Sequence, residues 1–273
     1  MRKLFVFLVV VGMLAASCGS DDGAKISIIL EPLISGASLA DLERARDVID
    51  KRLEELGLGS ASVSVEKGRL EVRDAELGAE GEKTLTRPGR LMFCEPIVNH
   101  EGEIAITWEG TVVYEPGTCD PMRDDQGNIA IVGATLEYVL WDPTVVTYRV
   151  GNIVWQPAKG DDGRELTGEF LKPTTQVREG ALGLPILLFE LTDEGGVIMS
   201  DVTARLASGS YPLAPFIDGE PMKGEDGTII APLVHGQVTT ISVIEGLSRR
   251  DAETLSVILN AGVLPIGLKA VEP

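Results

Sequence analysis

The chain repeats one order of elements near both of its ends, and this repetition limits the folds that it can adopt. Near the N-terminus, a strand-like run rich in Ile is followed by an amphipathic helix over 39–56 and then by Gly57. Ser38 and Asp41 have the spacing of a helix-capping pair at its start. Two short strand-like runs come next. The N-terminal part therefore has the order strand, capped helix, glycine, strand.

The end of the chain has the same order. A strand-like run leads to a helix over 249–261, with Ser248 and Asp251 at its start and Gly262 at its end, and a strand follows. Matching elements at both ends predict one sheet built from both, with the middle of the chain inserted as a second lobe. Such a sheet is typical of ferredoxin-like folds, in which split βαβ halves interlock. We therefore expect an α+β protein with a ferredoxin-like base and an inserted α/β head lobe.

The pattern also sets the expected boundaries of the lobes. We expect the base over 26–98 and 246–273, and the head lobe over 99–245. The two capped helices should pack on one face of the base sheet. The strands of that sheet should include Ile26–Leu30, Ser62–Val65, Leu70–Val72 and Leu264–Val271. A chain of 273 residues is long enough for one large core or two modest ones.

The first residues have the features of a secretory signal peptide. Arg2 and Lys3 precede an apolar run over 4–14, which is too short to favour a lasting membrane span. The sequence before Cys18 resembles a bacterial lipobox, the signal for attaching a lipid to that cysteine. We expect a signal peptide over 1–17, a lipidated Cys18 and a tether over 18–25, anchoring the chain at the extracytoplasmic face of the cell membrane. The alternative is a plain signal peptide with an incidental cysteine.

The acidic composition argues against two classes of partner. The formal net charge is −18 at pH 7, and removing Arg2 and Lys3 with the signal peptide takes it to −20. Such a charge repels phosphates, so we do not expect nucleic-acid binding. It also disfavours electrostatic binding to anionic lipid, so contact with the membrane should depend on the lipid anchor.

Two further cysteines, Cys94 and Cys119, follow the lipobox cysteine. Outside the cytoplasm a pair of thiols can oxidise, and a disulfide that closes a loop of this length would stabilise the fold by about 3–4 kcal/mol. We expect a disulfide between them, the alternative being a buried Cys94 and an unpaired Cys119. The chain has no CxxC and no zinc-ligand spacing, so we expect no metal.

The chain lacks the residue patterns of an enzyme. His100 and His235 are its only histidines, and neither lies in a metal-binding or nucleophile motif. Acidic clusters lack the ligand spacing of an EF-hand and fit solvated turns better. Asp218 and Glu194 stand out as single polar residues, with the simple roles of a turn residue and a first-turn helix acid. We expect no catalytic residue and no cofactor.

All three tryptophans, Trp108, Trp141 and Trp155, lie in a strand-rich stretch over 99–159. Interleaved aromatic side chains can form a binding face. In strands, however, they more often belong to a core.

Five short motifs follow one another in the second half of the chain. They are Leu166-Thr167-Gly168, Asp193-Glu194-Gly195, Asp218-Gly219, Ala231-Pro232 and Ala261-Gly262-Val263-Leu264-Pro265. In their order and spacing, and together with the helix over 39–56 and the hairpin after it, they resemble the first large extracytoplasmic domain of SecD, the membrane subunit that assists the bacterial Sec translocase. The resemblance spans most of residues 26–272 and is weakest over 99–160.

The chain departs from the SecD pattern in several places. The family's GLDLxGG stretch is absent, and the glycine-rich stretch after the fourth motif is thinned. The family's bundle of membrane helices, which carries its ion-coupling carboxylates, is also missing. We therefore expect a chain that does not by itself couple transport to an ion gradient.

The resemblance implies a non-enzymatic role on exported polypeptides. A lipid-anchored domain of this kind would bind unfolded exported polypeptide through its head lobe, or contact Sec translocase subunits, and so assist protein translocation. The alternative is a solute- or ligand-binding lipoprotein, whose two lobes close on a small molecule in a pocket lined by convergent polar groups. An unrecognised hydrolase is disfavoured by the absence of its motifs.

Overall fold

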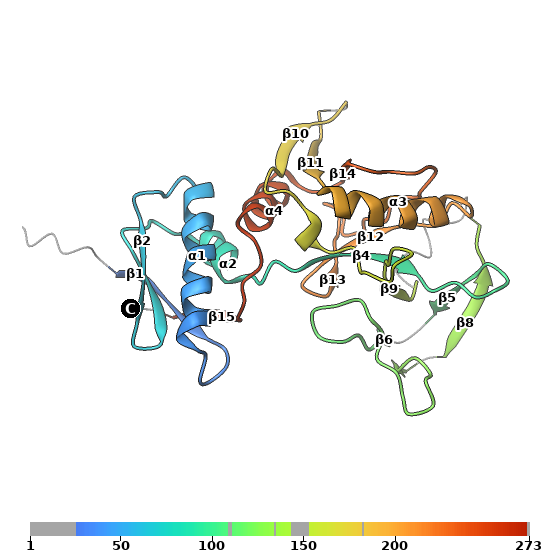
Figure 1. Cartoon of the computed structure of the whole chain (residues 1–273), viewed down its shortest axis with the longest axis horizontal. Helices are drawn as coiled ribbons and strands as arrows, with labels where there is room; N and C mark the ends of the chain where they lie inside the picture. The colour runs from blue at the N-terminus through green and yellow to red at the C-terminus, as the bar shows by residue number, and fades with distance from the viewer. Residues whose placement is uncertain (1–25, 109–110, 134, 143–152, 182, 272–273) are drawn as a thin grey trace, which may run out of the picture.

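A computed structural model describes residues 26–271, apart from 109–110, 134, 143–152 and 182. The described chain is a mixed α+β protein with two lobes, which lie at opposite ends of Figure 1. Each lobe has a core of its own, since the buried side chains of the base and those of the head fall into separate clusters. We keep the names base and head for these lobes.

The base contains a four-stranded sheet with strands from both parts of the chain. Its members are β1 (Ile26–Pro32), β2 (Ser62–Glu66), β3 (Arg69–Arg73) and β15 (Leu268–Val271). The strand order is β15-β1-β3-β2, and every neighbouring pair is antiparallel. In the register of β1 and β15, Leu30 lies opposite Ala270.

Two helices cover one face of this sheet. Helix α1 (Leu39–Glu55) begins at Ser38, whose hydroxyl oxygen accepts a 3.1 Å hydrogen bond from the Asp41 N–H. Its apolar stripe lies at helical spacing and is fully buried; the stripe is Leu42, Ala45, Ile49 and Leu53. The short helix α2 (Ala79–Thr86) contributes Leu85 to the same core.

Helix α4 (Arg249–Ala261) corrects one of the sequence expectations. It does not pack on the base sheet beside α1, because Ala252 and Leu255 belong to the head core. One side of α4 packs on the head strands β10 (Gln176–Glu179) and β11 (Pro185–Glu190), and the other side lies against α1 and α2 (Figure 1). Helix α4 therefore lies between the two lobes. The second helix that packs into the base core is α2 instead.

The head is built around two sheets. The first has the order β13-β12-β4-β9, from Glu220–Pro221, Ala214–Ile217, Leu91–Pro96 and Trp155–Pro157. The second has the order β10-β11-β14, with β14 at Ile241–Glu245. The head also contains helix α3 (Asp193–Ala207) and the 3₁₀ helix η3 (Gly168–Phe170). Strand β4 was expected in the base, but it pairs with β12 and β9 in the head, so the chain leaves the base near Pro88 instead of after residue 98.

A smaller layer covers the outer face of β4 and β12. It holds β5 (Glu103–Thr107) paired with β8 (Leu136–Leu140), and β6 (Thr111–Val112) paired with β7 (Ile131–Val132). Trp155 is buried between this layer and the sheet, in T-shaped contact with Phe216. Trp141 is partly buried and donates to the Ser210 carbonyl, whereas Trp108 is half exposed and donates to Glu137. The tryptophans thus form no continuous face.

None of the described helices is both long enough and apolar enough to cross a lipid bilayer.

Candidate functional site

The head contains a half-open cavity of about 460 Å³ between β11, β14 and the segment 230–238. Its inner wall is apolar and comes from five different elements. These side chains are Phe93 of β4, Phe189 of β11, Met199 of α3, Leu213 and Pro215 near the start of β12, and Ile244 of β14. A concave, mostly apolar site of this size is within the usual range for ligand pockets, about 300–1,000 Å³.

The outer wall is a segment without regular structure that hydrogen bonds hold in place. The Val234 N–H donates to the Tyr211 carbonyl over 3.0 Å, and the Leu213 N–H donates to the Pro232 carbonyl over 3.1 Å. Further along, the Val238 N–H donates to the Thr203 hydroxyl of α3 over 2.9 Å. The wall is therefore attached to α3 and β12, and the cavity lies between it and the edge of β14.

The polar groups of the cavity do not form a catalytic arrangement. The Thr203 hydroxyl already donates to the Met199 carbonyl over 2.7 Å, and Gln237 already donates to Ser200. His235 is exposed on the rim. Among the described residues there is no group of three or more His, Cys, Asp or Glu side chains placed to hold a metal ion. The mostly apolar lining of the cavity suits apolar side chains.

An acidic hollow adjoins the cavity. The two share Ile230, Pro232 and Glu245, and the hollow also contains Glu225 and Asp226. Asp226 is held by Thr228, whose N–H and hydroxyl both donate to its carboxylate, and these hydrogen bonds lower the pKa of Asp226. No Lys or Arg lines either space, so the site as a whole favours cationic over anionic groups.

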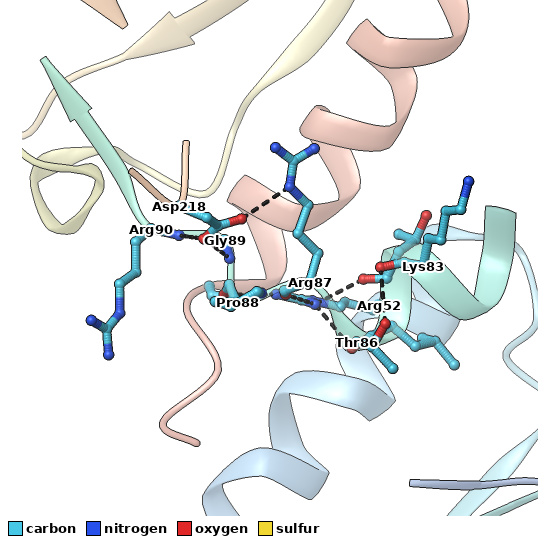
Figure 2. A network of polar contacts seen from close by, with 11 residues as sticks. Arg52, Lys83, Thr86, Arg87, Pro88, Gly89, Arg90 and Asp218 are labelled. Atoms are coloured by element: carbon cyan, nitrogen blue, oxygen red, sulfur yellow. Dashed lines mark hydrogen bonds and ion pairs between the residues drawn. The ribbon is translucent and has the colours of Figure 1, made fainter. Parts of the chain in front are cut away.

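Asp218, which the sequence suggests is a turn residue, lies where the chain passes from base to head. Its backbone has φ of +59°, and one carboxylate oxygen accepts from the Gly89 and Arg90 N–H groups, each at 2.8 Å. The other oxygen accepts from Arg87 Nε at 3.0 Å (Figure 2). A residue of the head thus binds the segment that leaves the base.

Arg52 of α1 completes this junction, and its role is not evident from the sequence. Its side chain has no exposed surface, and it donates to carbonyls of the outgoing segment, at 2.6 Å to Arg87 and 3.3 Å to Pro88 (Figure 2). It also donates to Gly262, where the chain returns from the head, at 3.1 Å. Burial lowers the pKa of Arg52 to about 10, while the Asp218 carboxylate opposes this shift. We call Arg52, Asp218, the segment 84–90 and Gly262 the crossing hub.

The other residues singled out from the sequence lie apart from the cavity. Cys94 of β4 and Cys119 are both fully buried, and the structure joins them in a disulfide with Cα atoms 6.5 Å apart. Glu194, in the first turn of α3, is exposed and pairs with Arg164 at 2.8 Å. His100 is exposed in the turn before β5. Cys18 lies outside the described residues.

The comparisons with known proteins agree with the motif resemblance. No protein-family model matches the chain. It is 38% identical over 120 residues to the protein translocase subunit SecD of Dehalococcoides mccartyi (strain VS), a match that covers 43% of the chain and 26% of the relative. It is 26% identical over 188 residues to the SecD subunit of Acidaminococcus fermentans, covering 68% of the chain and 36% of the relative. The matches thus span roughly a quarter to a third of the length of these curated relatives.

Two solved structures share the fold. A crystal structure of SecDF in a super-membrane-facing form has a TM-score of 0.58 and 21% identity, covering 90% of this chain and 29% of that one. A structure of SecDF, described as a membrane component that enhances protein export, has a TM-score of 0.54 and 20% identity, covering 90% of this chain and 98% of that one. Similarity to SecD in sequence and to SecDF in fold together support a SecD-like extracytoplasmic domain.

Proposed function

We propose that this protein takes part in protein export and that the cavity in its head holds segments of unfolded exported polypeptides. The names of its relatives, a protein translocase subunit and a component that enhances protein export, support a role in translocation. The observation that carries the binding proposal is the half-open apolar cavity beside β14. Unfolded chains expose apolar side chains that folded proteins bury, and an apolar cavity accepts them.

The base would serve as the support of this binding lobe. We propose that it is a ferredoxin-like platform, in agreement with the strand order β15-β1-β3-β2. We further propose that residues 1–17 are a signal peptide and that a lipid on Cys18 anchors the base at the extracytoplasmic face of the membrane. Labelling cells with a radioactive fatty acid tests the anchor, because wild type should be labelled and Cys18→Ser should not.

A solute-binding lipoprotein is the second candidate function, since the cavity has the volume of a small-molecule pocket. Two features favour polypeptide over solute. The cavity lies within the head and not between the lobes, and the hydroxyl and amide groups of Thr203 and Gln237 at its wall already have partners. A small solute that binds tightly needs several polar groups directed into its pocket.

Site-specific crosslinking tests the polypeptide proposal. A photo-crosslinking residue replaces His235 on the cavity rim, and a second variant carries it at Leu33, which is exposed on the base. The full chain is mixed with an exported protein in its unfolded and folded forms. We expect a crosslink from position 235 to the unfolded form alone, and only background from position 33. Equal crosslinking from both positions would contradict binding at the cavity.

A cavity-filling variant adds a second readout. Ser242→Phe places a ring where Ser242 lines the cavity, and it should reduce the crosslink. Thr240→Phe is the matched control, because Thr240 precedes β14 and lies outside the cavity. If a screen of small molecules instead finds a ligand that Ser242→Phe excludes, and unfolded protein does not bind, the solute-binding function is correct.

A further inference from the structure

Strand β14 presents an open edge beside the cavity. In the described part of the chain it has a strand neighbour on one side only, β11. The Leu191 N–H donates to the Thr240 carbonyl over 2.8 Å, which fixes the phase of the hydrogen bonds between the two strands. Because these bonds alternate along an antiparallel pair, Ser242 and Ile244 direct their backbone groups to β11. The N–H and C=O groups of Ile241, Val243 and Glu245 therefore face the open edge.

The two faces of β14 differ in their surroundings. Ile244 is buried in the head core, and its cross-strand partner Leu187 lies on the same face. Ile241 and Val243 lie on the opposite face with 58% and 39% of their surface exposed. A native edge of this kind, apolar and exposed, is a ready template for another strand.

The cavity lies where the side chains of an added strand would point. On an antiparallel pair, residues directly opposite each other share a face. Residues of an added strand opposite Ser242 and Ile244 would thus point to the core side, where Phe93, Phe189 and Leu213 line the cavity. The backbone edge and the apolar space are positioned to bind one extended segment together.

The acidic residues near the end of β14 favour a basic residue at one end of the added segment. Glu245 lies at the end of β14, where the cavity meets the acidic hollow with Glu225 and Asp226. None of the ion pairs among the described residues involves Glu225 or Glu245. A Lys or Arg side chain next to Glu245 would meet three carboxylates, whereas an acidic one would be repelled.

We propose that β14 binds an extended polypeptide segment by strand addition, with two alternate apolar side chains in the cavity and a basic side chain at the acidic hollow. This proposal rests on the proposed function and specifies the segment that the head holds. Antiparallel pairing is slightly more stable per residue than parallel pairing, so the segment should run opposite to β14. From its N-terminus, the segment then has a basic residue opposite Glu245 and an apolar residue opposite Ile244. Any residue can follow opposite Val243, and a second apolar residue lies opposite Ser242.

Fluorescent peptides test this order with the full chain. The first has Lys-Leu-Thr-Val between Gly-Ser ends, and the second has the reverse order, Val-Thr-Leu-Lys. Shifted by one residue, the reversed peptide still places Val and Leu opposite Ile244 and Ser242, but its Lys lies opposite Ile241, away from Glu245. It should therefore bind about two- to fivefold more weakly, the effect of one exposed charge pair. Glu245→Gln should reduce this difference between the two peptides.

Backbone methylation tests strand addition itself. In the proposed register the Thr N–H of the first peptide points to Val243 and the Leu N–H points away. Methylating the Thr nitrogen should weaken binding about fivefold or more, whereas methylating the Leu nitrogen should have little effect. On the protein, Val243→Pro removes the matching N–H, and Val243→Thr keeps it as the control.

The outcomes separate this proposal from the proposed function. If both methylated peptides bind equally well, or Val243→Pro binds as wild type, strand addition at β14 is wrong. If unfolded protein crosslinks at position 235 but no peptide binds, the head holds polypeptide in another way. If neither binds, both proposals fail. A concentration-dependent dimer that Val243→Pro abolishes would assign the β14 edge to a second copy of the chain instead.

Discussion

Arg52 donates a hydrogen bond to the carbonyl oxygen of Gly262, 210 residues further along the chain, at 3.1 Å. The same guanidinium bonds the carbonyls of Arg87 and Pro88. One buried cation in α1 therefore contacts both segments that connect base and head.

Replacing Arg52 should destabilise the protein more than a typical core substitution. Arg52→Met fills part of the space but leaves the carbonyls of Arg87 and Gly262 buried without their donor. We expect a loss of about 3 kcal/mol in the free energy of unfolding, measured by urea titration. Arg46→Met on the exposed side of α1 is the control and should change it by less than about 0.5 kcal/mol. Equal losses of stability in the two variants would show that the hydrogen bonds of Arg52 in the crossing hub do not stabilise the fold more than a surface arginine does.

The carboxylate of Asp218 should matter for its oxygen atoms more than for its charge. Asp218→Asn keeps an acceptor for the Gly89 and Arg90 N–H groups and tolerates a φ of +59°. We expect it to cost less than about 1 kcal/mol. Asp218→Ala removes these two hydrogen bonds and the one from Arg87 Nε, and it strains the backbone, so it should cost about 2–3 kcal/mol. Thermal unfolding distinguishes the two, and an equally large loss for Asn would assign the effect to the charge pair with Arg87.

Gly89 should not accept even one methyl group. It has φ of +86°, and an added Cβ would lie 2.5 Å from Ile258 Cγ2 and 3.1 Å from Arg52 Nη2. Gly89→Ala should therefore cost about 2–4 kcal/mol, from backbone strain and overpacking together. Gly127 is the matched control, with φ of +84° and open space around it, so Gly127→Ala should cost only about 1 kcal/mol. The difference in urea midpoint between the variants measures the steric part alone.

Glu95 should make the stability depend on pH in the mildly acidic range. Burial raises the pKa of Glu95, and Arg205, whose Nη2 is 2.8 Å from its carboxylate, opposes this only in part. The folded pKa then lies above the unfolded one, so the contribution of Glu95 is fully present below its ordinary value of 4.5 and is lost as pH rises through the folded pKa.

Unfolding curves at pH 4, 5.5 and 7 check this prediction. The stability of wild type relative to Glu95→Gln should fall as the pH rises, and Arg205→Leu should make the fall steeper. A relative stability that grows with pH would mean that the ion pair outweighs burial.

The disulfide between Cys94 and Cys119 should be present in protein isolated under non-reducing conditions and should stabilise the head. It closes a loop of 25 residues, for which the loss of unfolded-chain entropy predicts about 3–4 kcal/mol. Reductant should lower the melting temperature of wild type to that of the Cys94→Ser/Cys119→Ser double variant and leave the variant unchanged. Two free thiols in mass spectra of non-reduced protein would rule the bond out.

Local sequence signals predict the two capped helices well. Ser38 and Ser248 mark the starts of α1 and α4, and the hydroxyl of each accepts from the N–H of an Asp three residues on. What the sequence did not reveal is the partner of α4. Its buried residues occupy two sides of the helix, Ala252 and Leu255 towards the head and Ile258 near Gly89. A helix with two apolar sides can face either lobe, so periodicity alone does not choose.

The candidate site was harder to predict for a similar reason. Phe189 and Ile244 look like ordinary buried strand residues in the sequence, and only the three-dimensional arrangement leaves a space beside them. The buried position of Arg52 is equally hard to predict from the sequence. It stands three residues after Ile49 and one before Leu53, on the buried side of α1, but a basic residue in a last turn usually fits the helix dipole at the surface.

The pairing of β1 with β15 has a consequence for the order in which the protein folds. The two sheets of the head lie within residues 91–245, so they can form from a continuous stretch of chain. The base sheet needs Leu30 opposite Ala270, a contact that closes nearly the whole chain into a loop and is slow to form. When the chain emerges from its N-terminus first, the edge of β1 that pairs with β15 therefore stays uncovered until the C-terminal strand is available. During that interval the base is the part of the protein most prone to aggregation.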